Sequence, residues 1–437
     1  MPSSASSARS DVPHYGERGV PLAQAWQHGL VAVAELGFSA RLDPLTTDEP
    51  GAWRCVLEQD GVPVTRGTGF GKGRRQAARV GAIFEALEHH LSAGMPPQTS
   101  VVLRGAHEAA AGELARDAAC ALLAEGPDVP IACLPYTPLP GHAGDEMLVP
   151  VFLSTPDYLH QEAAARAAAG DSYDYTALRR YSVTNGWAAG ATPAEAMVHA
   201  INEVIERDAI SILLIGQFLS PAPATLPVID TGTLPAALAA LHEEAERRLD
   251  RRVWLLEMTT DVGVPAYWAH SPATEPAVPS LLRGFGASLS ACFAAEQALN
   301  ELIQTHSGLR AASGEKGRRY VCTEAYPALH RCYLADFRIP RTARIPFSET
   351  PAPATPAEYL EALCETLHRA GFTPRVWQRH VSDHLSVLNV IIPGMERFML
   401  VTSGQLVLPG PRGRTALTGL SPSSQTAGGG NGRVSDT

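Results

Sequence analysis

The chain of 437 residues contains no clustered cysteines, no long apolar run and no excess of basic residues. Its seven cysteines are scattered and none forms a C-x-x-C pair, which argues against a cysteine-rich zinc site and favours free thiols in a reducing compartment. No stretch reaches about 18 consecutive apolar residues, so we expect no membrane-spanning helix. A net charge of −10 argues against a nucleic-acid binder with a broad basic face. Without a signal-peptide pattern at its N-terminus, the protein is predicted to be cytoplasmic.

Lysine is the scarcest charged residue of the chain. Only Lys72 and Lys316 are lysine among 35 basic residues, and the remainder are arginine. A lysine in such an arginine-rich sequence is therefore more informative about function than a lysine usually is. The hydrophobic fraction of 45% is that of a folded globular protein with a large core.

Helical and extended patterns interleave along the chain, which predicts an α/β or α+β fold with mixed sheets. We expect a disordered N-terminus over 1–15, one folded domain over 16–412 and a disordered tail over 413–437. Proline-rich stretches near 221–231 and 350–357 mark places where this domain could subdivide. The spacing predicts helices over 103–126, 193–217 and 292–305, and glycine-bounded turns at 67–73 and 284–286.

An acidic helical pattern recurs three times, each time after a glycine-bounded segment. The copies are Glu85-x-x-Glu88, Glu203-x-x-Glu206 and Glu301-x-x-Gln304. Spacing of three residues places both side chains on one helix face, and each pair lies among apolar neighbours. Oxygen ligands from several helices suit Mg²⁺, which usually takes a few carboxylates together with phosphate oxygens. A single copy is more often a solvated helix face, but three matched copies favour a metal site.

The helix predicted from Pro193 carries further polar groups on the same face. Glu195 completes a capping box with Thr192, so capping and ligand binding are equally good interpretations of it. Arg207 is suited to clamping a phosphate, or to pairing with Asp208. The histidines at 89, 90 and 199 are predicted to pack or to form hydrogen bonds, because no histidine spacing of a zinc site is present.

The glycine-rich run from Gly67 to Gly73 is not a P-loop, because the number of residues before Lys72 is too small and glycine follows it. Glycines before a helix can still present backbone N–H groups to an anion, with Lys72 as a point charge. Beside a helix that carries Glu85 and Glu88, this run indicates a nucleotide site outside the P-loop class.

These motifs together resemble the YcaO family. The matching segments are Gly71-Lys-Gly73, Glu85-Ala-Leu-Glu88, Thr184-Asn-Gly-Trp through Glu195 to Asp208, Ala298 to Gln304, and Val390-Ile-Ile-Pro-Gly394, so that the resemblance extends from about 60 to 412. It implies an ATP-binding fold unlike kinases or P-loop proteins, with ATP and Mg²⁺ as cofactors. It further implies roles for nine residues: Glu85, Glu88, Glu203 and Glu206 as metal ligands, Glu195, Glu301, Gln304, Lys72 and Arg207 as cofactor-binding residues, and Arg207 and Glu206 as catalytic.

The sequences around Asn185 and Arg207 most resemble those of the azoline-forming branch of this family. The resemblance implies a cyclodehydratase that phosphorylates a backbone amide and converts Cys, Ser or Thr of a ribosomal precursor peptide into thiazoline or oxazoline. The implied partners are that peptide, a separate leader-binding protein related to ubiquitin-activating enzymes, a flavin dehydrogenase in the same complex, and a second copy of the chain, with neither nucleic acid nor membrane.

Two departures separate the chain from this branch. Ala191 replaces the asparagine that many members have after the glycine corresponding to Gly190, and the chain lacks a terminal Pro-x-Pro-x-Pro sequence. Thioamide or macroamidine formation with the same ATP site is therefore an alternative. A non-catalytic peptide-binding scaffold is a second alternative, although the retention of four glutamates and Arg207 argues against it.

Overall fold

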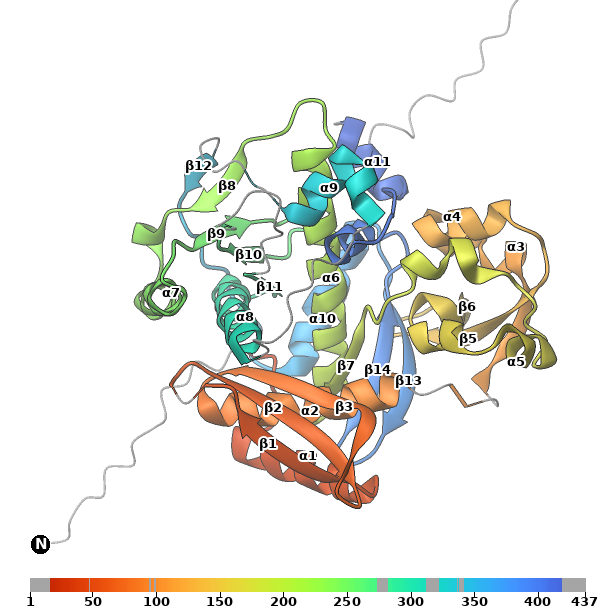
Figure 1. The fold of residues 1–437 in the computed structure, drawn as a ribbon, viewed down its shortest axis with the longest axis horizontal. Helices are drawn as coiled ribbons and strands as arrows, with labels where there is room; N and C mark the ends of the chain where they lie inside the picture. The colour runs from red at the N-terminus through yellow and green to blue at the C-terminus, as the bar shows by residue number, and fades with distance from the viewer. Residues whose placement is uncertain are drawn as a thin grey trace, which may run out of the picture.

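The computed structural model describes residues 16–46, 48–93, 96–97, 100–272, 282–311, 322–335, 337 and 342–418. The 26-residue helix α6 (Pro193–Phe218) stands at the centre of the molecule (Figure 1). It begins as the sequence predicts, because Thr192 caps it by accepting a hydrogen bond from the Glu195 N–H at 3.3 Å and Pro193 occupies its first turn. Three sheets and the remaining helices surround it.

The first sheet is an antiparallel meander that lies beneath the lower end of α6 in Figure 1. Its strands, in the order β1-β2-β3, are β1 (Ser39–Pro44), β2 (Gly51–Gln59) and β3 (Val62–Gly73), and the helices packed on it are α1 (Leu22–Glu35) and α2 (Arg75–Ala93). Strands β2 and β3 form a hairpin around Asp60 and Gly61.

The glycine run of residues 67–73, which we expected to be a turn, is instead the second half of β3. A Cβ at Gly71 would lie 1.7 Å from the Ala78 carbonyl oxygen, and one at Gly69 would lie 2.2 Å from the Ala86 nitrogen. These glycines therefore let α2 lie directly on the strand, and the sequence signal that suggested an anion-binding loop reflects close packing.

The second sheet is mixed and has the strand order β11-β10-β9-β8-β12, with β8 and β12 parallel. Its elements are β8 (Leu226–Ile229), β9 (Trp254–Glu257), β10 (Ala266–His270), β11 (Arg283–Ala287) and β12 (Thr342–Ile345), with α7 (Ala236–Leu249) and α8 (Ala291–Ala311) against it. Residues 284–286, also expected to be a turn, belong to β11. A Cβ at Gly284 would lie 2.2 Å from the Ala298 carbonyl oxygen, so α8 packs on β11 as α2 packs on β3.

The third sheet continues into the lobe at the right of Figure 1. Its path is β4-β5-β13-β14-β7, with β6 beside β5, and its strands are β4 (Val102–Gly105), β5 (Pro130–Pro138), β6 (Met147–Pro150), β7 (Trp187–Gly190), β13 (Arg375–Val381) and β14 (Ser386–Ile391). The helices in this lobe are α3 (Ala106–Ala109), α4 (Ala118–Glu125) and α5 (Ala163–Ala168), and the helices that contact α6 are α9 (Pro327–Leu334), α10 (Pro356–Arg369) and α11 (Pro411–Thr418).

The single helix predicted over 103–126 is wrong. Residues 102–105 form β4, and two short helices with a 3₁₀ turn between them follow. Gly112 has φ +62°, which interrupts a helix, and the Asp117 carboxylate caps α4 by accepting from the Ala119 N–H at 2.8 Å. The high alanine content of this segment suggested one continuous helix and did not reveal these local interruptions.

Further 3₁₀ turns cover Val151–Leu153, Pro156–His160, Tyr175–Ala177, Arg179–Tyr181, Thr231–Thr233, Cys322–Ala325 and Phe398–Ser403. All seven cysteines are free and five are buried, as the scattered pattern predicts. Residues 413–418 of the expected disordered tail belong to α11, whereas the rest of that tail and the expected disordered N-terminus lie outside the described residues.

Candidate nucleotide and metal site

Helices α2, α6 and α8 bring the three copies of the acidic pattern together. Figure 1 shows α8 beside α6, with α2 and its sheet beneath both. The glutamates of these helices perturb one another electrostatically: Glu88 interacts with Glu85 and Glu203, and Glu206 interacts with Glu301 and Glu203. Residues that are more than 200 positions apart in the sequence thus share one site.

The protein around these carboxyl groups makes their ionised forms costly. Burial raises the pKa of Glu85 to about 7, an effect that Lys72 partly offsets. Burial, followed by repulsion from Glu203 and Glu85, raises the pKa of Glu88 well above its ordinary value. The pKa values of Glu203 and Glu206 are likewise raised, mainly by burial. The groups retain access to solvent, since the side chains of Glu85 and Glu203 are 37% and 17% exposed.

Two cations lie within this acidic cluster. Lys72 reaches it from β3, and its Nζ lies 2.5 Å from Oε2 of Glu301. Arg207 pairs with Glu203 at 2.6 Å rather than with its neighbour Asp208. The Asp208 carboxylate is fully buried and instead accepts hydrogen bonds from Arg412 at 2.8 and 3.0 Å. Lys72 and Arg207 thus each form an ion pair with one of the five glutamates of the cluster, which are Glu85, Glu88, Glu203, Glu206 and Glu301.

Glu195 has a different environment from the other predicted site residues. Its Oε2 accepts from the Ala191 N–H at 2.9 Å, and its Oε1 accepts from the backbone of Gly19 and Val20. The carboxylate is 3% exposed, and backbone groups engage both of its oxygens. This favours the capping interpretation over ligand binding. Gln304 lies one turn beyond Glu301 on α8 and is half-buried.

The donor set suits Mg²⁺ only when phosphates complete it. Within the described ranges, no three His, Cys, Asp or Glu side chains are close enough to hold a metal by themselves. Mg²⁺ usually keeps several waters and is bound through one or two carboxylates together with phosphate oxygens. A surplus of buried carboxylates, with raised pKa values and too few cations, is the chemistry that such an ion satisfies. The residues therefore fit a Mg²⁺–phosphate ligand rather than a preformed metal cage.

Three residues near this cluster were missed by the sequence interpretation. Arg283 on β11 interacts with Glu301, and its buried Nη1 has no hydrogen-bond partner among the described residues. The pKa of His199 is lowered to about 4, first by the burial of its ring and second by the positive charge of Arg18, which is exposed. Glu17 beside it is buried and accepts from Ser288 at 2.6 Å. A lone arginine before a glycine strand, or at the start of the folded region, carries no local pattern that could have found them.

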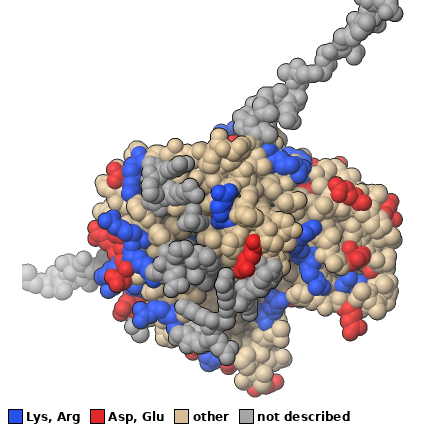
Figure 2. All heavy atoms as spheres, turned by 45° about the horizontal axis from the view of Figure 1, so that its top comes forward, with Lys and Arg blue, Asp and Glu red and all other residues tan. Residues whose placement is uncertain are grey.

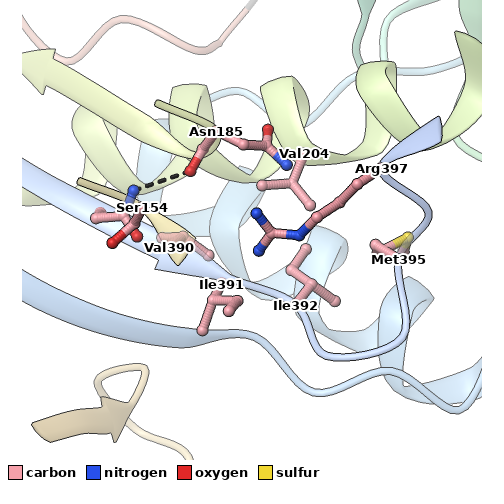
Figure 3. Close-up of a pocket in the computed structure, with 9 residues that line it drawn as sticks. Ser154, Asn185, Val204, Val390, Ile391, Ile392, Met395 and Arg397 are labelled. Atoms are coloured by element: carbon pink, nitrogen blue, oxygen red, sulfur yellow. Dashed lines mark hydrogen bonds between the residues drawn. The ribbon is translucent and has the colours of Figure 1, made fainter. Parts of the chain in front are cut away.

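A cavity of about 10 Å³ beside Asn185 is too small for a nucleotide (Figure 3). Asn389 donates to the Asn185 carbonyl at 2.9 Å, and the Arg397 guanidinium lies between Val204 and Ile392 in this view. Its volume is about that of one water molecule. Its lining contains none of the clustered glutamates, so it is structural rather than part of the site.

Charges of both signs are interspersed on the face that Figure 2 shows, and neither gathers over one element among the described residues there. Among the helices in the described part of the chain, none is long and apolar enough to cross a membrane.

A family model described as "YcaO cyclodehydratase, ATP- and Mg²⁺-binding" matches residues 70–396, which is most of the chain. The chain belongs to the YcaO family. The family resemblance stated from the motifs is therefore confirmed, and so are ATP and Mg²⁺ as the family's cofactors. The α/β class of the fold, outside the P-loop and kinase folds, is also confirmed.

Two solved structures share this fold at low sequence identity. The YcaO protein of Methanopyrus kandleri, bound with AMPPCP and Mg²⁺, is 19% identical over 91% of this chain and 98% of its own length, with a TM-score of 0.60. A heterocyclase in complex with substrate and cofactor is 18% identical over 86% of this chain, with a TM-score of 0.62. The match spans 52% of that heterocyclase, so this chain covers about half of its length.

One curated relative adds sequence similarity over a short segment. An uncharacterized protein from the tfuA 3′ region of Rhizobium leguminosarum bv. trifolii is 35% identical over 86 residues, which is 20% of each chain. A further structure, the E. coli microcin synthetase McbBCD complex, is 10% identical over 82% of this chain and 88% of its own, with a TM-score of 0.51. At these identities the solved structures establish the fold of this YcaO protein.

Proposed function

We propose that this YcaO protein uses ATP and Mg²⁺ to activate a backbone amide of a ribosomal peptide, and that the product is an azoline. The observation that carries the proposal is the acidic cluster of α2, α6 and α8 with Lys72 and Arg207 inside it. Phosphoryl transfer needs chiefly positioning and neutralisation of charge, which is what this set of side chains offers.

The proposed reaction balances as a loss of water driven by ATP. The substrate thiol or hydroxyl attacks the preceding amide carbonyl, the carbonyl oxygen takes the γ-phosphoryl group, and ADP leaves. Phosphate then departs with the former amide oxygen as the C=N bond of the azoline forms, and the nucleophile and amide protons pass to solvent. Bound Mg²⁺ supplies charge neutralisation on the phosphates.

The protein side chains have separate proposed tasks in this chemistry. Glu85, Glu88, Glu203 and Glu206 would hold Mg²⁺, and Lys72 and Arg207 would contact phosphate oxygens. To contact the phosphate, Lys72 would give up part of its ion pair with Glu301, and Arg207 would give up part of its ion pair with Glu203. Among the residues predicted to bind the cofactor, Glu195 is proposed only to hold the backbone at the start of α6.

Peptide capture is proposed to require a separate leader-binding protein. The heterocyclase that shares this fold is about twice as long as the matched region, and a further relative was solved as part of a synthetase complex. Both facts support a division of labour between a YcaO chain and other protein. A cytoplasmic location remains a prediction.

The decisive experiment measures phosphate release by the purified protein with Mg²⁺ and ATP, with and without the precursor and partner encoded beside its gene. We compare the wild type with Glu203→Gln, and use Glu243→Gln, on the exposed face of α7, as the matched control. The proposal is supported if the wild type and Glu243→Gln release phosphate only with the peptide and remove one water per modified residue, and if Glu203→Gln does neither. Turnover without loss of water would instead indicate thioamide formation. Loss of water that leaves every Cys, Ser and Thr side chain free would indicate an amidine, and absence of nucleotide binding in the wild type would leave only a scaffold.

A further inference from the structure

The last part of the folded chain returns to α6 directly after the residues of the proposed phosphate site. Helix α11 and the 3₁₀ turn before it both contact α6 (Figure 1). The Glu396 N–H donates to Oδ1 of Asp208 at 2.8 Å. One turn further along α6, the Ser211 hydroxyl donates to the Arg207 carbonyl at 2.7 Å and accepts from the Met399 N–H at 2.8 Å. These contacts hold α6 at the turn that follows the acidic pair Glu203-x-x-Glu206.

Arg412, in the first turn of α11, is the cation of this contact. Its Nε and Nη2 donate to the two oxygens of the Asp208 carboxylate at 2.8 and 3.0 Å, which is the bidentate geometry of a strong arginine–carboxylate pair. The Asp208 carboxylate is fully buried, and the Arg412 side chain is only 11% exposed. Arg412 also pairs with Asp261 at 2.5 Å, but the Asp261 side chain is 54% exposed and has water as an alternative partner.

Helix α11 has a second attachment that does not involve Asp208. The Glu396 carboxylate is buried, and its Oε2 accepts from the N–H groups of Gly410 and Gly413 at 2.9 and 2.8 Å. These hydrogen bonds fix the backbone at the start of the helix. The start of α11 is thus held without the Arg412 side chain, whose distinct contribution is the positive charge that it brings to Asp208.

That charge matters because Asp208 is the sequence neighbour of Arg207. Successive residues of a helix point about 100° apart, so Arg207 faces the acidic cluster, where it pairs with Glu203, while Asp208 faces α11. A buried carboxylate that loses its counter-charge is strongly destabilised and attracts a cation within reach. Without Arg412, the Asp208 carboxylate would compete for the guanidinium that the proposed function assigns to a phosphate.

We infer that Arg412 is a positioning residue, which neutralises Asp208 and thereby keeps Arg207 in the acidic cluster, available to the phosphate. The inference rests on the proposed function and adds to it a residue that acts through Arg207. It differs from a merely structural role in one respect. If the pair only joined α11 to α6, its removal from either side would have the same effect on the site, whereas a neutralising role makes only the loss of Arg412 harmful.

Calorimetric titration of the full chain with AMPPNP and Mg²⁺ distinguishes the two roles. Arg412→Gln should weaken AMPPNP binding about tenfold or more, because the unpaired Asp208 carboxylate then competes for Arg207. Asp208→Asn and the double variant Asp208→Asn/Arg412→Gln should bind within about twofold of the wild type, since neither contains an unpaired carboxylate at position 208. Asp261→Asn, the matched control that removes the exposed partner of Arg412, should also leave the affinity unchanged.

A second measurement ties the effect to Arg207. In a protein that carries Arg207→Gln, the addition of Arg412→Gln should cause no further loss of affinity, because the side chain that it positions is already absent. If Arg412→Gln alone does not fold, the double variant with Asp208→Asn decides the question, and weakened binding by that variant overturns the inference.

Two other results would also overturn it: equal losses of affinity in Asp208→Asn and Arg412→Gln, or unchanged affinity in Arg412→Gln. A wild type that does not bind AMPPNP would refute the proposed function itself and this inference with it. Binding by the wild type with equal losses in the variants would refute only the role of Arg412.

Discussion

Glu85→Gln should stabilise the protein in the absence of Mg²⁺, because the wild-type carboxylate is ionised at a cost. Its folded-state pKa is about 7, against an ordinary value of 4.5. The folded state therefore binds the proton more tightly than the unfolded state, and the free energy of unfolding falls as the pH rises from about 4.5 to about 7. Between pH 6 and pH 8 a fully buried group with this pKa would cost about 1.4 kcal/mol. Since 37% of the Glu85 side chain is exposed, screening reduces the expected cost to about 0.5–1 kcal/mol.

Urea unfolding at pH 6 and pH 8 measures this effect as a difference between wild type and variant. The difference is needed because burial lowers the pKa values of His199 and His270 to about 4, so their contribution to stability falls with decreasing pH, in the opposite sense. Both histidines are present in both proteins and cancel. We expect the stability advantage of Glu85→Gln to be larger at pH 8 than at pH 6 by about 0.5–1 kcal/mol.

Two further measurements make the reasoning refutable. Saturating Mg²⁺ and AMPPNP should reverse the advantage of Glu85→Gln, because a bound cation stabilises the ionised carboxylate and binding stabilises the wild type. The matched control is Glu58→Gln on β2, whose carboxylate pairs with Arg41 at 2.8 Å, and which should lose about 0.2–1 kcal/mol instead. If Glu85→Gln is no more stable than wild type at pH 8 without metal, ionisation of the Glu85 carboxylate does not lower the free energy of unfolding, and the reasoning is refuted.

Three other predictions concern single side chains. Gly71→Ala should destabilise the protein by about 3 kcal/mol or more in urea unfolding, because its Cβ would meet the Ala78 carbonyl oxygen. The control Gly81→Ala, whose Cβ would lie 3.7 Å from Gly71, should instead stabilise α2 by about 0.5–1 kcal/mol. Equal effects of the two substitutions on the free energy of unfolding would contradict the close approach of strand and helix. Lys72→Met should weaken AMPPNP binding at least about tenfold in calorimetric titration, with partial recovery in Lys72→Arg, and an unchanged affinity would remove Lys72 from the phosphate site. Glu195→Ala should lower the unfolding free energy by about 1–2 kcal/mol, because backbone N–H groups that include Ala191 lose their acceptor; if nucleotide affinity fell without loss of stability, ligand binding would be its role.

Local sequence signals were sufficient wherever the structure depends on neighbours along the chain. The cap at Thr192 with Pro193 marked the start of α6, and spacing of three residues placed Glu203 and Glu206 on one face, because helix geometry alone decides both. Local composition misled where one signal has two causes. Glycine occurs both in turns and where a helix approaches a strand closely, so a glycine in the sequence does not distinguish the two. Only the packed structure shows that Gly71 and Gly284 allow the close approach of a helix.

The sequence by itself thus determined the family, the acidic helices and the cofactor class of this YcaO protein. Tertiary structure decided which charges meet: Lys72 pairs with Glu301, which is 229 positions away, and Glu195 binds the backbone of Gly19 rather than facing the cluster. The physical reason is that periodicity fixes the direction of a side chain from its own helix, whereas its partner depends on how distant elements pack.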